Sequence, residues 1–196
     1  MSPRHSDAPQ RVVSAAEDML ARVGLNATSI REVSKLAEAP LGSTYHHFPG
    51  GKQELLAKAT RQAGDKVDAL LERVLQAGAS EGLAQFLAMW RERLLRAQFQ
   101  VGCPVLAASV EEPVDAVARD VRDAAEEVFS RWGGRLGASL QAAGHAPAQA
   151  ATLATLIIAS VEGAVAMCRA TQSIEPFDRV AAQLRSLVYT GLNSPV

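Results

Sequence analysis

The sequence is poor in cysteine and carries almost no net charge. Its two cysteines, Cys103 and Cys168, exclude the dense disulfide framework of a small secreted domain and favour reduced thiols. The first ten residues contain no hydrophobic signal core, and no run of about 18 uninterrupted apolar residues occurs. We therefore expect a cytoplasmic protein with no membrane partner.

Aromatic residues are also scarce, at 5% of the chain, whereas 48% of the residues are apolar, with frequent alanine and leucine. β-Branched residues are scattered and no strand-like alternation competes, so helix is favoured nearly throughout. A chain of 196 residues can form one sizeable core or two small domains. The sequence predicts an all-α fold.

The net charge of -1 argues against indiscriminate binding to nucleic acids, although it says little about any local surface. Basic residues near the N-terminal end of the chain that could share one local surface include Arg4, Arg11, Arg31, Lys35 and Lys52. Acidic residues of the same region include Glu17, Asp18, Glu32 and Glu38. If this region binds DNA, we expect a modest electrostatic contribution to its affinity.

Residues 28–56 contain two short helix signals joined by a tight turn. Ser29 and Glu32 form a capping box, and apolar residues then recur at helical spacing as far as Leu36 and Ala37. This pattern predicts a helix over residues 30–38. Pro40 suits the first turn of a second helix, which Pro49 and the glycines after it end near residue 48. The stretch is typical of a helix-turn-helix.

The second of these helices is too short to be stable alone, so its neighbours must hold it. It carries Gly42, Ser43, Thr44, Tyr45, His46 and His47. Small residues allow a close backbone approach, and hydroxyl, phenol and imidazole groups can donate to phosphate oxygens and base edges. These features suit insertion into the major groove of DNA.

The segment TSIREVSKLAEAPLGSTYHHFPGGKQEL, residues 28–55, resembles the DNA-binding signature of the TetR family of bacterial transcriptional regulators. Its HHFPGGKQEL end, with GCPV at residues 102–105, is similar to the LmrA/YxaF-type subgroup. Two positions depart from the family pattern: Glu38 stands where the turn commonly has glycine, and Leu41 where a lysine or polar residue is common. The resemblance implies a three-helix DNA-binding domain over residues 1–50 and a larger helical domain for ligand binding and dimerisation over 51–196.

The same resemblance implies contacts with double-stranded operator DNA. It places Thr28 and Ser29 near the phosphate backbone, Ser43 and Thr44 near bases, Tyr45 and His47 on phosphates, Lys52 as an ammonium contact, and Leu41 at a specificity position. For Thr28 and Ser29, helix capping alone is an equal interpretation. We expect no metal at His46 and His47, because adjacent residues on a helix point about 100° apart and no cysteine or carboxylate cluster accompanies them.

The remainder of the chain reads as further helices. They are expected at 52–77, at 80–99, as a short helix or turn at 105–111, from Pro113 through Val117 to Leu140, at 147–171, and from Pro176 to about Leu192. Residues 147–171 are apolar on most of the helix circumference, which implies burial on two sides that one chain does not cover. We therefore predict that the last two helices pair with their copies in a homodimeric four-helix bundle. Two recognition helices could then read half-sites about one DNA turn apart.

A group of residues on successive helices could line a cavity for a small hydrophobic effector: Phe86, Met89, Trp90, Phe99, Cys103, Trp132, Glu162, Met167 and Cys168. Each could equally be ordinary core. Glu162 must be paired, for example with Arg169 or across a dimer, or solvated, or positioned for a polar or cationic ligand. Cys103 before a proline is either an oxidant-sensitive thiol or, more simply, a small buried apolar residue.

The sequence thus favours a homodimeric DNA-binding transcriptional regulator, a repressor that an effector releases from its operator. The alternative is a helical protein-interaction module whose helix-turn-helix has lost DNA binding. An enzyme is not supported, because the histidines at 5, 46, 47 and 145 form no recognisable set of nucleophile, base and orienting group. No cofactor is implied.

Overall fold

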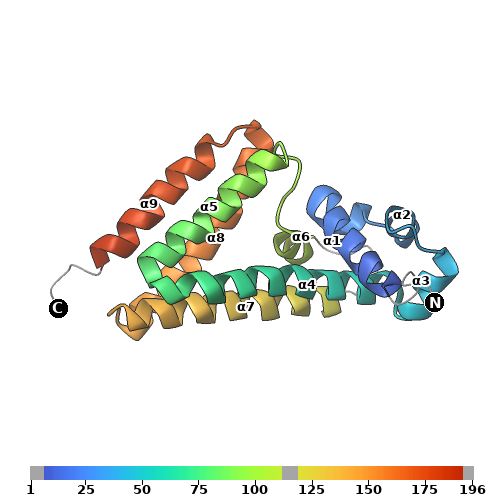
Figure 1. The fold of residues 1–196 in the computed structure, drawn as a ribbon, viewed down its shortest axis with the longest axis horizontal. Coiled ribbons are helices and arrows are strands. Elements are labelled where there is room, and N and C mark those ends of the chain that lie inside the picture. The colour runs from blue at the N-terminus through green and yellow to red at the C-terminus, as the bar shows by residue number, and fades with distance from the viewer. Residues whose placement is uncertain (1–6, 112–118, 192–196) are drawn as a thin grey trace. The chain divides into compact units, whose positions relative to one another are not determined.

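A computed structural model describes residues 7–111 and 119–191, which form nine α-helices, one 3-10 turn and no strand (Figure 1). The predicted all-α fold is confirmed. The chain divides into two compact units, one of Met1–Asp65 with Cys103–Val128 and the other of Lys66–Gly102 with Phe129–Val196. The expected Arg4, Pro113, Val117 and Leu192 lie outside the described residues.

The first unit contains helices α1 (Ala8–Ala27), α2 (Ile30–Leu36), α3 (Leu41–His47) and α6 (Pro104–Val110), with the starts of α4 (Gly51–Val74) and α7 (Arg119–Ala142). Helix α2 is two residues shorter than predicted, because Ala37 caps it and Glu38 turns into the left-handed region at φ 50°. That conformation favours glycine, the residue that the family pattern has here. Pro40 is the N-cap of α3 rather than a residue of its first turn.

The second unit contains α5 (Ala79–Arg96), α8 (Pro147–Thr171) and α9 (Glu175–Gly191), together with the ends of α4 and α7 and the 3-10 turn Leu75–Ala77. Helices α5, α8 and α9 pack on one another around buried apolar side chains. The largest of these include Phe86, Trp90, Trp132, Ile157 and Phe177. This unit therefore has a conventional apolar core.

Helices α4 and α7 lie side by side and each contributes to both units (Figure 1). In the first unit Arg61 Nε and Glu127 Oε2 lie 2.8 Å apart, and in the second Arg135 Nε lies 2.5 Å from Asp68 Oδ1. The unit boundary thus falls within α4, beyond residue 50, and α6 belongs with the N-terminal helices. The predicted functional division at residue 50 stays a prediction.

Helix α8 is covered on one side only. Ile157, Val161 and Cys168 are buried, whereas Leu156 and Met167 are exposed. By length and composition α8 is the one described helix apolar enough to cross a membrane, with a mean hydropathy of 1.8 and 39% of that window buried. Core helices of soluble proteins meet the same criterion, and α8 carries the buried Glu162 in its apolar stretch.

Candidate nucleic-acid interface

Helix α3 separates an inner and an outer face within seven residues. Thr44 and Phe48, one turn apart, are buried. Leu41 and Tyr45 are 39% and 53% exposed, and Gly42, His46 and His47 are exposed too, whereas Ser43 is half-buried. The outer face therefore presents a phenol and two imidazoles, which are polar groups that can donate to phosphates and bases.

The structure gives Thr44 an internal role, and the base contact predicted for this residue stays a prediction. Its side chain is buried, and its Oγ1 accepts a hydrogen bond of 2.9 Å from the hydroxyl of Ser34 on α2. The Thr44 hydroxyl also lies 3.4 Å from the carbonyl oxygen of Pro40. Thr44 therefore fixes how α3 packs on α2, which leaves Ser43 and Tyr45 as the neighbouring residues that can face outward.

Gly42 has no internal reason to be glycine. A β-carbon built there would meet no atom within 4 Å, and α3 has ordinary helical geometry at this position. The absent side chain instead leaves helix backbone uncovered beside Leu41 and Tyr45. A second surface can approach that backbone closely, as the sequence predicted for the start of this helix.

The corner between α1 and α2 is held by side chains that bind its backbone. Gly24 adopts φ 82° and ψ −177°, a conformation essentially restricted to glycine. The carboxylate of Glu111, just after α6, accepts from the amides of Leu25 and Asn26 at 2.9 Å each. A β-carbon on Gly24 would lie 2.0 Å from Glu111 Oε1. The corner and Glu111 therefore fit only with glycine at this position.

Two predicted DNA contacts belong to the same corner. Thr28 is buried and its hydroxyl donates to the carbonyl of Gly24 at 2.6 Å, so the side chain holds the corner, and the phosphate contact predicted for it stays a prediction. Lys52, at the start of α4, donates from Nζ to the carbonyl of Asn26 at 3.1 Å. The ammonium group has further N–H donors, so Lys52 can hold the corner and still contact a phosphate.

Ser29 caps α2 as predicted, because its Oγ accepts from the amide of Glu32 at 3.2 Å. The hydroxyl proton goes to the Glu32 carboxylate at 2.9 Å. This arrangement supports the capping interpretation of Ser29, and a phosphate contact by its half-exposed side chain stays a prediction.

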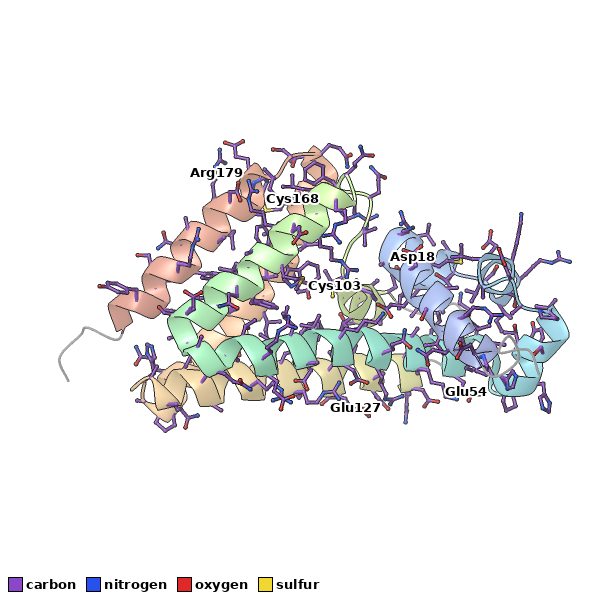
Figure 2. All side chains as sticks on the ribbon, in the orientation of Figure 1. Asp18, Glu54, Cys103, Glu127, Cys168 and Arg179 are labelled. Carbon is purple, nitrogen blue, oxygen red and sulfur yellow. The ribbon has the colours of Figure 1, made fainter. Side chains whose placement is uncertain are left out.

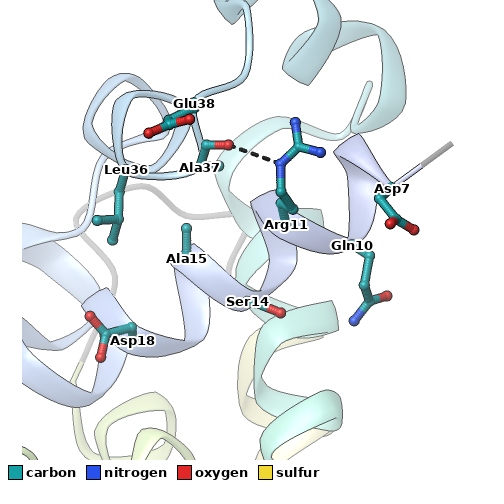
Figure 3. Close-up of a pocket in the computed structure, with 9 residues that line it drawn as sticks. All are labelled: Asp7, Gln10, Arg11, Ser14, Ala15, Asp18, Leu36, Ala37 and Glu38. Carbon is teal, nitrogen blue, oxygen red and sulfur yellow. Dashed lines mark hydrogen bonds between the residues drawn. The ribbon is translucent and has the colours of Figure 1, made fainter. Parts of the chain in front are cut away.

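An open groove of about 580 Å³ runs between α1 and α2, lined by Asp7, Gln10, Arg11, Ser14, Ala15, Asp18, Leu36, Ala37 and Glu38 (Figure 3). Arg11 Nε donates across it to the carbonyl of Ala37 at 3.3 Å, so this guanidinium stabilises the end of α2. Leu36 is exposed rather than part of the apolar face expected of it. On α2 the exposed Arg31 and Lys35 remain as cations that can approach phosphates.

The junction of α3 with α4 is held by Glu54. The Gly50 amide donates to its carboxylate at 2.8 Å, and Lys58 pairs with it at 2.7 Å. The hydrogen bond from Lys58, followed by that from Gly50, lowers the pKa of Glu54 below its ordinary value. The Lys58 ammonium also lies 5.1 Å from the centre of the buried Phe48 ring, which closes α3.

Two residues of this region were not assigned a role from the sequence. His46 was counted among the polar residues of the second helix but given no contact of its own, yet it shares the outer face of α3 with Gly42 and Tyr45. The one-turn spacing of Thr44 and Phe48 could have revealed that face. Glu111 carried no local signal, because it lies 86 residues from Leu25 in sequence.

The predicted effector residues are mostly internal. Phe86, Trp90, Trp132 and Glu162 are buried in the second unit, and Met89 and Phe99 are partly exposed there. Met167 is 56% exposed on α8, and its place in an effector cavity stays a prediction. Cys103 belongs to the first unit.

Both cysteines are buried, and neither forms a disulfide bond (Figure 2). Cys103 stands at the N-cap of α6 without a side-chain capping bond. Burial raises the pKa of the Cys168 thiol, which keeps it protonated and unreactive near neutral pH. In residues 7–111 and 119–191 no three histidine, cysteine or acidic side chains are grouped in a way that could hold a metal ion.

Two protein-family models match the chain, one toward each end. Residues 12–59 match the N-terminal model of the bacterial tetR regulatory proteins. Residues 79–183 match the C-terminal domain model of LmrA/YxaF-like transcriptional regulators. The chain belongs to the TetR family. Members of this family are transcriptional regulators rather than enzymes, and the predicted LmrA/YxaF-type subgroup is confirmed.

Curated relatives cover nearly the whole chain. An uncharacterised helix-turn-helix transcriptional regulator of Mycobacterium tuberculosis is 35% identical over 187 residues, which span 93% of this chain and 95% of the relative. The regulators YxaF and LmrA of Bacillus subtilis are 26% and 24% identical, over 93% and 94% of this chain and 95% and 98% of their own. This TetR-family chain is therefore a helix-turn-helix transcriptional regulator.

Solved TetR regulators share the fold. A TetR regulator from Legionella pneumophila superposes with a TM-score of 0.81 at 20% identity, covering 95% of this chain and 98% of its own. A second, from Rhodobacter sphaeroides, gives a TM-score of 0.81 at 22% identity, covering 92% and 98%. At these identities the likeness establishes the TetR fold alone.

Proposed function

We propose that this TetR-family regulator is a cytoplasmic homodimeric repressor, which leaves its operator when a small, mostly apolar effector binds the C-terminal domain. The observation that carries the DNA half of this proposal is the outer face of α3. Leu41, Gly42, Tyr45 and His46 share one exposed face of a helix that is too short to be stable alone. A buried hydrogen bond between Ser34 and Thr44 holds its inner face against α2. A helix held in this way serves to present its outer side chains.

Cationic side chains near α3 can contact DNA phosphates, but acidic side chains lie among them. Arg31 and Lys35 lie one turn apart on the exposed side of α2, and Lys52 begins α4. Glu32 and Glu38 stand among them, so we expect an affinity that depends on fit as well as on phosphate neutralisation. Ser43, Tyr45, His46 and His47 supply the hydrogen-bond donors, and Leu41 can contact a thymine methyl group.

The uncovered side of α8 supports dimerisation. Ala159, Gly163 and Ala166 are exposed between Leu156 and Met167, forming an apolar stripe of small residues at helical spacing. Leu187 is exposed on α9, which packs directly on α8. Small residues let helices approach closely, so the two helices and their copies can form a four-helix bundle. A homodimer gives the regulator two copies of α3, one for each half-site.

Fluorescence anisotropy with labelled DNA flanking the protein's own coding region tests this proposal. Salt is titrated, and planar apolar compounds are then added at a salt concentration that gives half-saturation. We expect selective binding that weakens as salt rises, over a range set by the number of phosphates neutralised, and release by at least one compound. Selective binding that no compound reverses would contradict the effector role. Absence of selective binding, also from a random-sequence library, would favour a protein-interaction module.

A further inference from the structure

Helix α5 carries two neighbouring hydrogen-bond donors that the protein leaves without acceptors. Trp90 is 2% exposed, and its indole Nε1 has no hydrogen-bond partner. One turn later the Nε of Arg93 is covered and likewise lacks a partner. In the part of the chain that the structure describes, Arg93 forms no ion pair. Its guanidinium carbon lies 5.4 Å from the centre of the Trp90 ring.

These two donors point to an acceptor that comes from outside the chain. An indole can only donate, and a guanidinium can only donate, so neither group satisfies the other. Buried donors without partners are rare in folded proteins, because they have lost water and gained nothing in exchange. A guanidinium also matches the two oxygens of a carboxylate in shape and charge.

The same part of α5 carries apolar side chains next to the two donors. Phe86 lies one turn before Trp90 and is buried, and Met89 lies one turn before Arg93 and is partly exposed. Side chains at this spacing are neighbours on a helix surface. An aromatic side chain and a thioether are favourable neighbours for a flat ring, and the two donors stand beside them.

We propose that Trp90 and Arg93 form a subsite for an acidic oxygen, a carboxylate or phenolate, on a planar aromatic ligand. The inference rests on the proposed effector function and specifies its ligand. The oxygen accepts from Trp90 Nε1 and from the Arg93 guanidinium, while the ring packs on the apolar side chains of α5. The preferred effector is then an aromatic acid, not the cationic ligand that Glu162 alone would suggest.

Three probes with one ring system isolate this chemistry: 2-naphthoate, naphthalene and 2-naphthylmethylamine. Their binding to the full-length protein is measured by equilibrium dialysis in the absence of DNA. We expect 2-naphthoate to bind at least about tenfold more tightly than either of the others, because only its charged oxygens pair with both donors. Equal binding of the three, stronger binding of the amine, or no binding of 2-naphthoate at millimolar concentration overturns the subsite.

Arg93→Met removes every donor of that side chain while keeping its apolar stem. We expect this variant to bind 2-naphthoate and naphthalene within about threefold of each other. Arg96→Met is the matched control, since Arg96 lies on the same helix and pairs with Glu92 at the surface. It should keep the full preference. Trp90→Phe keeps a buried ring without the N–H and should lower the preference for 2-naphthoate. If Trp90→Phe unfolds, the comparison of Arg93→Met with Arg96→Met decides.

Release from DNA is measured separately with the same three probes. Tight binding of 2-naphthoate without release would support the subsite and contradict the effector role. Release by naphthalene or by the amine, without any preference for 2-naphthoate, would support the effector role and overturn the subsite.

Discussion

The N-terminal helices α1, α2 and α3, here called the head, and the pair α8 and α9 leave faces uncovered for different reasons. In the head, α2 and α3 are seven residues each and are pinned by side chains that bind backbone or one another, such as Glu111 at the α1–α2 corner and Ser34 on Thr44. In the second unit, α8 has 25 residues and packs through apolar side chains. The uncovered face of α3 is polar and aromatic, whereas that of α8 is apolar and small.

This difference shows how one chain can carry two kinds of surface. Short helices bury too little apolar area to fix their own orientation, so hydrogen bonds within the head set it. A long apolar helix is oriented by its buried side chains and needs no such hydrogen bonds. Burying its uncovered apolar stripe against another apolar surface is favourable, because that surface is removed from water. The polar face suits DNA and the apolar one suits a second copy of the chain. The predictions below test that assignment, beginning with the largest expected effect.

Leu156→Glu should break the proposed dimer. In a two-fold interface it places two carboxylates in the apolar stripe, at a cost of about 4 kcal/mol, which is roughly a thousandfold in the dimer dissociation constant. Sedimentation velocity measures this change. Leu95→Glu is the control, because Leu95 on α5 is 42% exposed and Leu156 is 41% exposed. If both variants remain dimeric, α8 is not the interface.

Replacing Tyr45 and His46 together by alanine should weaken operator binding by about 3 kcal/mol, a little over a hundredfold, because two outward donors are lost. Thermal unfolding and dimer mass should stay at their wild-type values, since both side chains are exposed. Anisotropy against the selected operator gives the affinity. Tyr45→Phe keeps the ring, so comparison with it separates the phenol's hydrogen bond from packing. Unchanged affinity of the double variant would remove α3's outer face from the interface.

Gly24→Ala should destabilise the head by about 2 kcal/mol, because alanine is strained at φ 82° and its β-carbon meets Glu111. Chemical denaturation followed by circular dichroism measures the change. A double-mutant cycle with Glu111→Ala divides the effect, since removing the carboxylate relieves the clash but not the backbone strain. Additive losses in that cycle would mean that Gly24 and Glu111 are not coupled.

Thr44→Val should lower stability by about 1 kcal/mol, because it removes the hydroxyl that accepts from the buried Ser34. Operator affinity should change less than about twofold, since Thr44 faces inward. Ser43→Ala should show the reverse pattern, with altered affinity and nearly unchanged stability. A large loss of affinity in folded Thr44→Val would instead support the base contact predicted for Thr44.

Long periodic elements were predictable from the sequence. The bounds expected for α8, 147–171, match the structure, because a proline opens the helix and the residues after it are mostly apolar and include no further proline. The capping role of Ser29 was equally predictable, because capping depends on a residue only three positions away. The helix-turn-helix followed from these local signals and from the family signature together.

Faces of short helices and distant contacts were less predictable. Seven residues make only two turns, so the pattern of α2 did not show that Leu36 points outward. In α3 only the one-turn spacing of Thr44 and Phe48 indicated which side points inward. The Glu111 contact joins residues far apart in sequence, and no periodicity reports on it. The turn at Glu38 was partly predictable. The family pattern commonly has glycine here, which indicates a left-handed backbone conformation, and Glu38 adopts that conformation at some cost in strain.

Native mass spectrometry of the protein on a duplex with two half-sites tests the central assignment most directly. If α3 reads DNA and α8 binds a second copy, every complex should contain an even number of chains. Leu156→Glu should then bind the same duplex far more weakly, while Leu95→Glu behaves as wild type. A single chain bound to one duplex, with the affinity of the wild-type complex, would contradict the account.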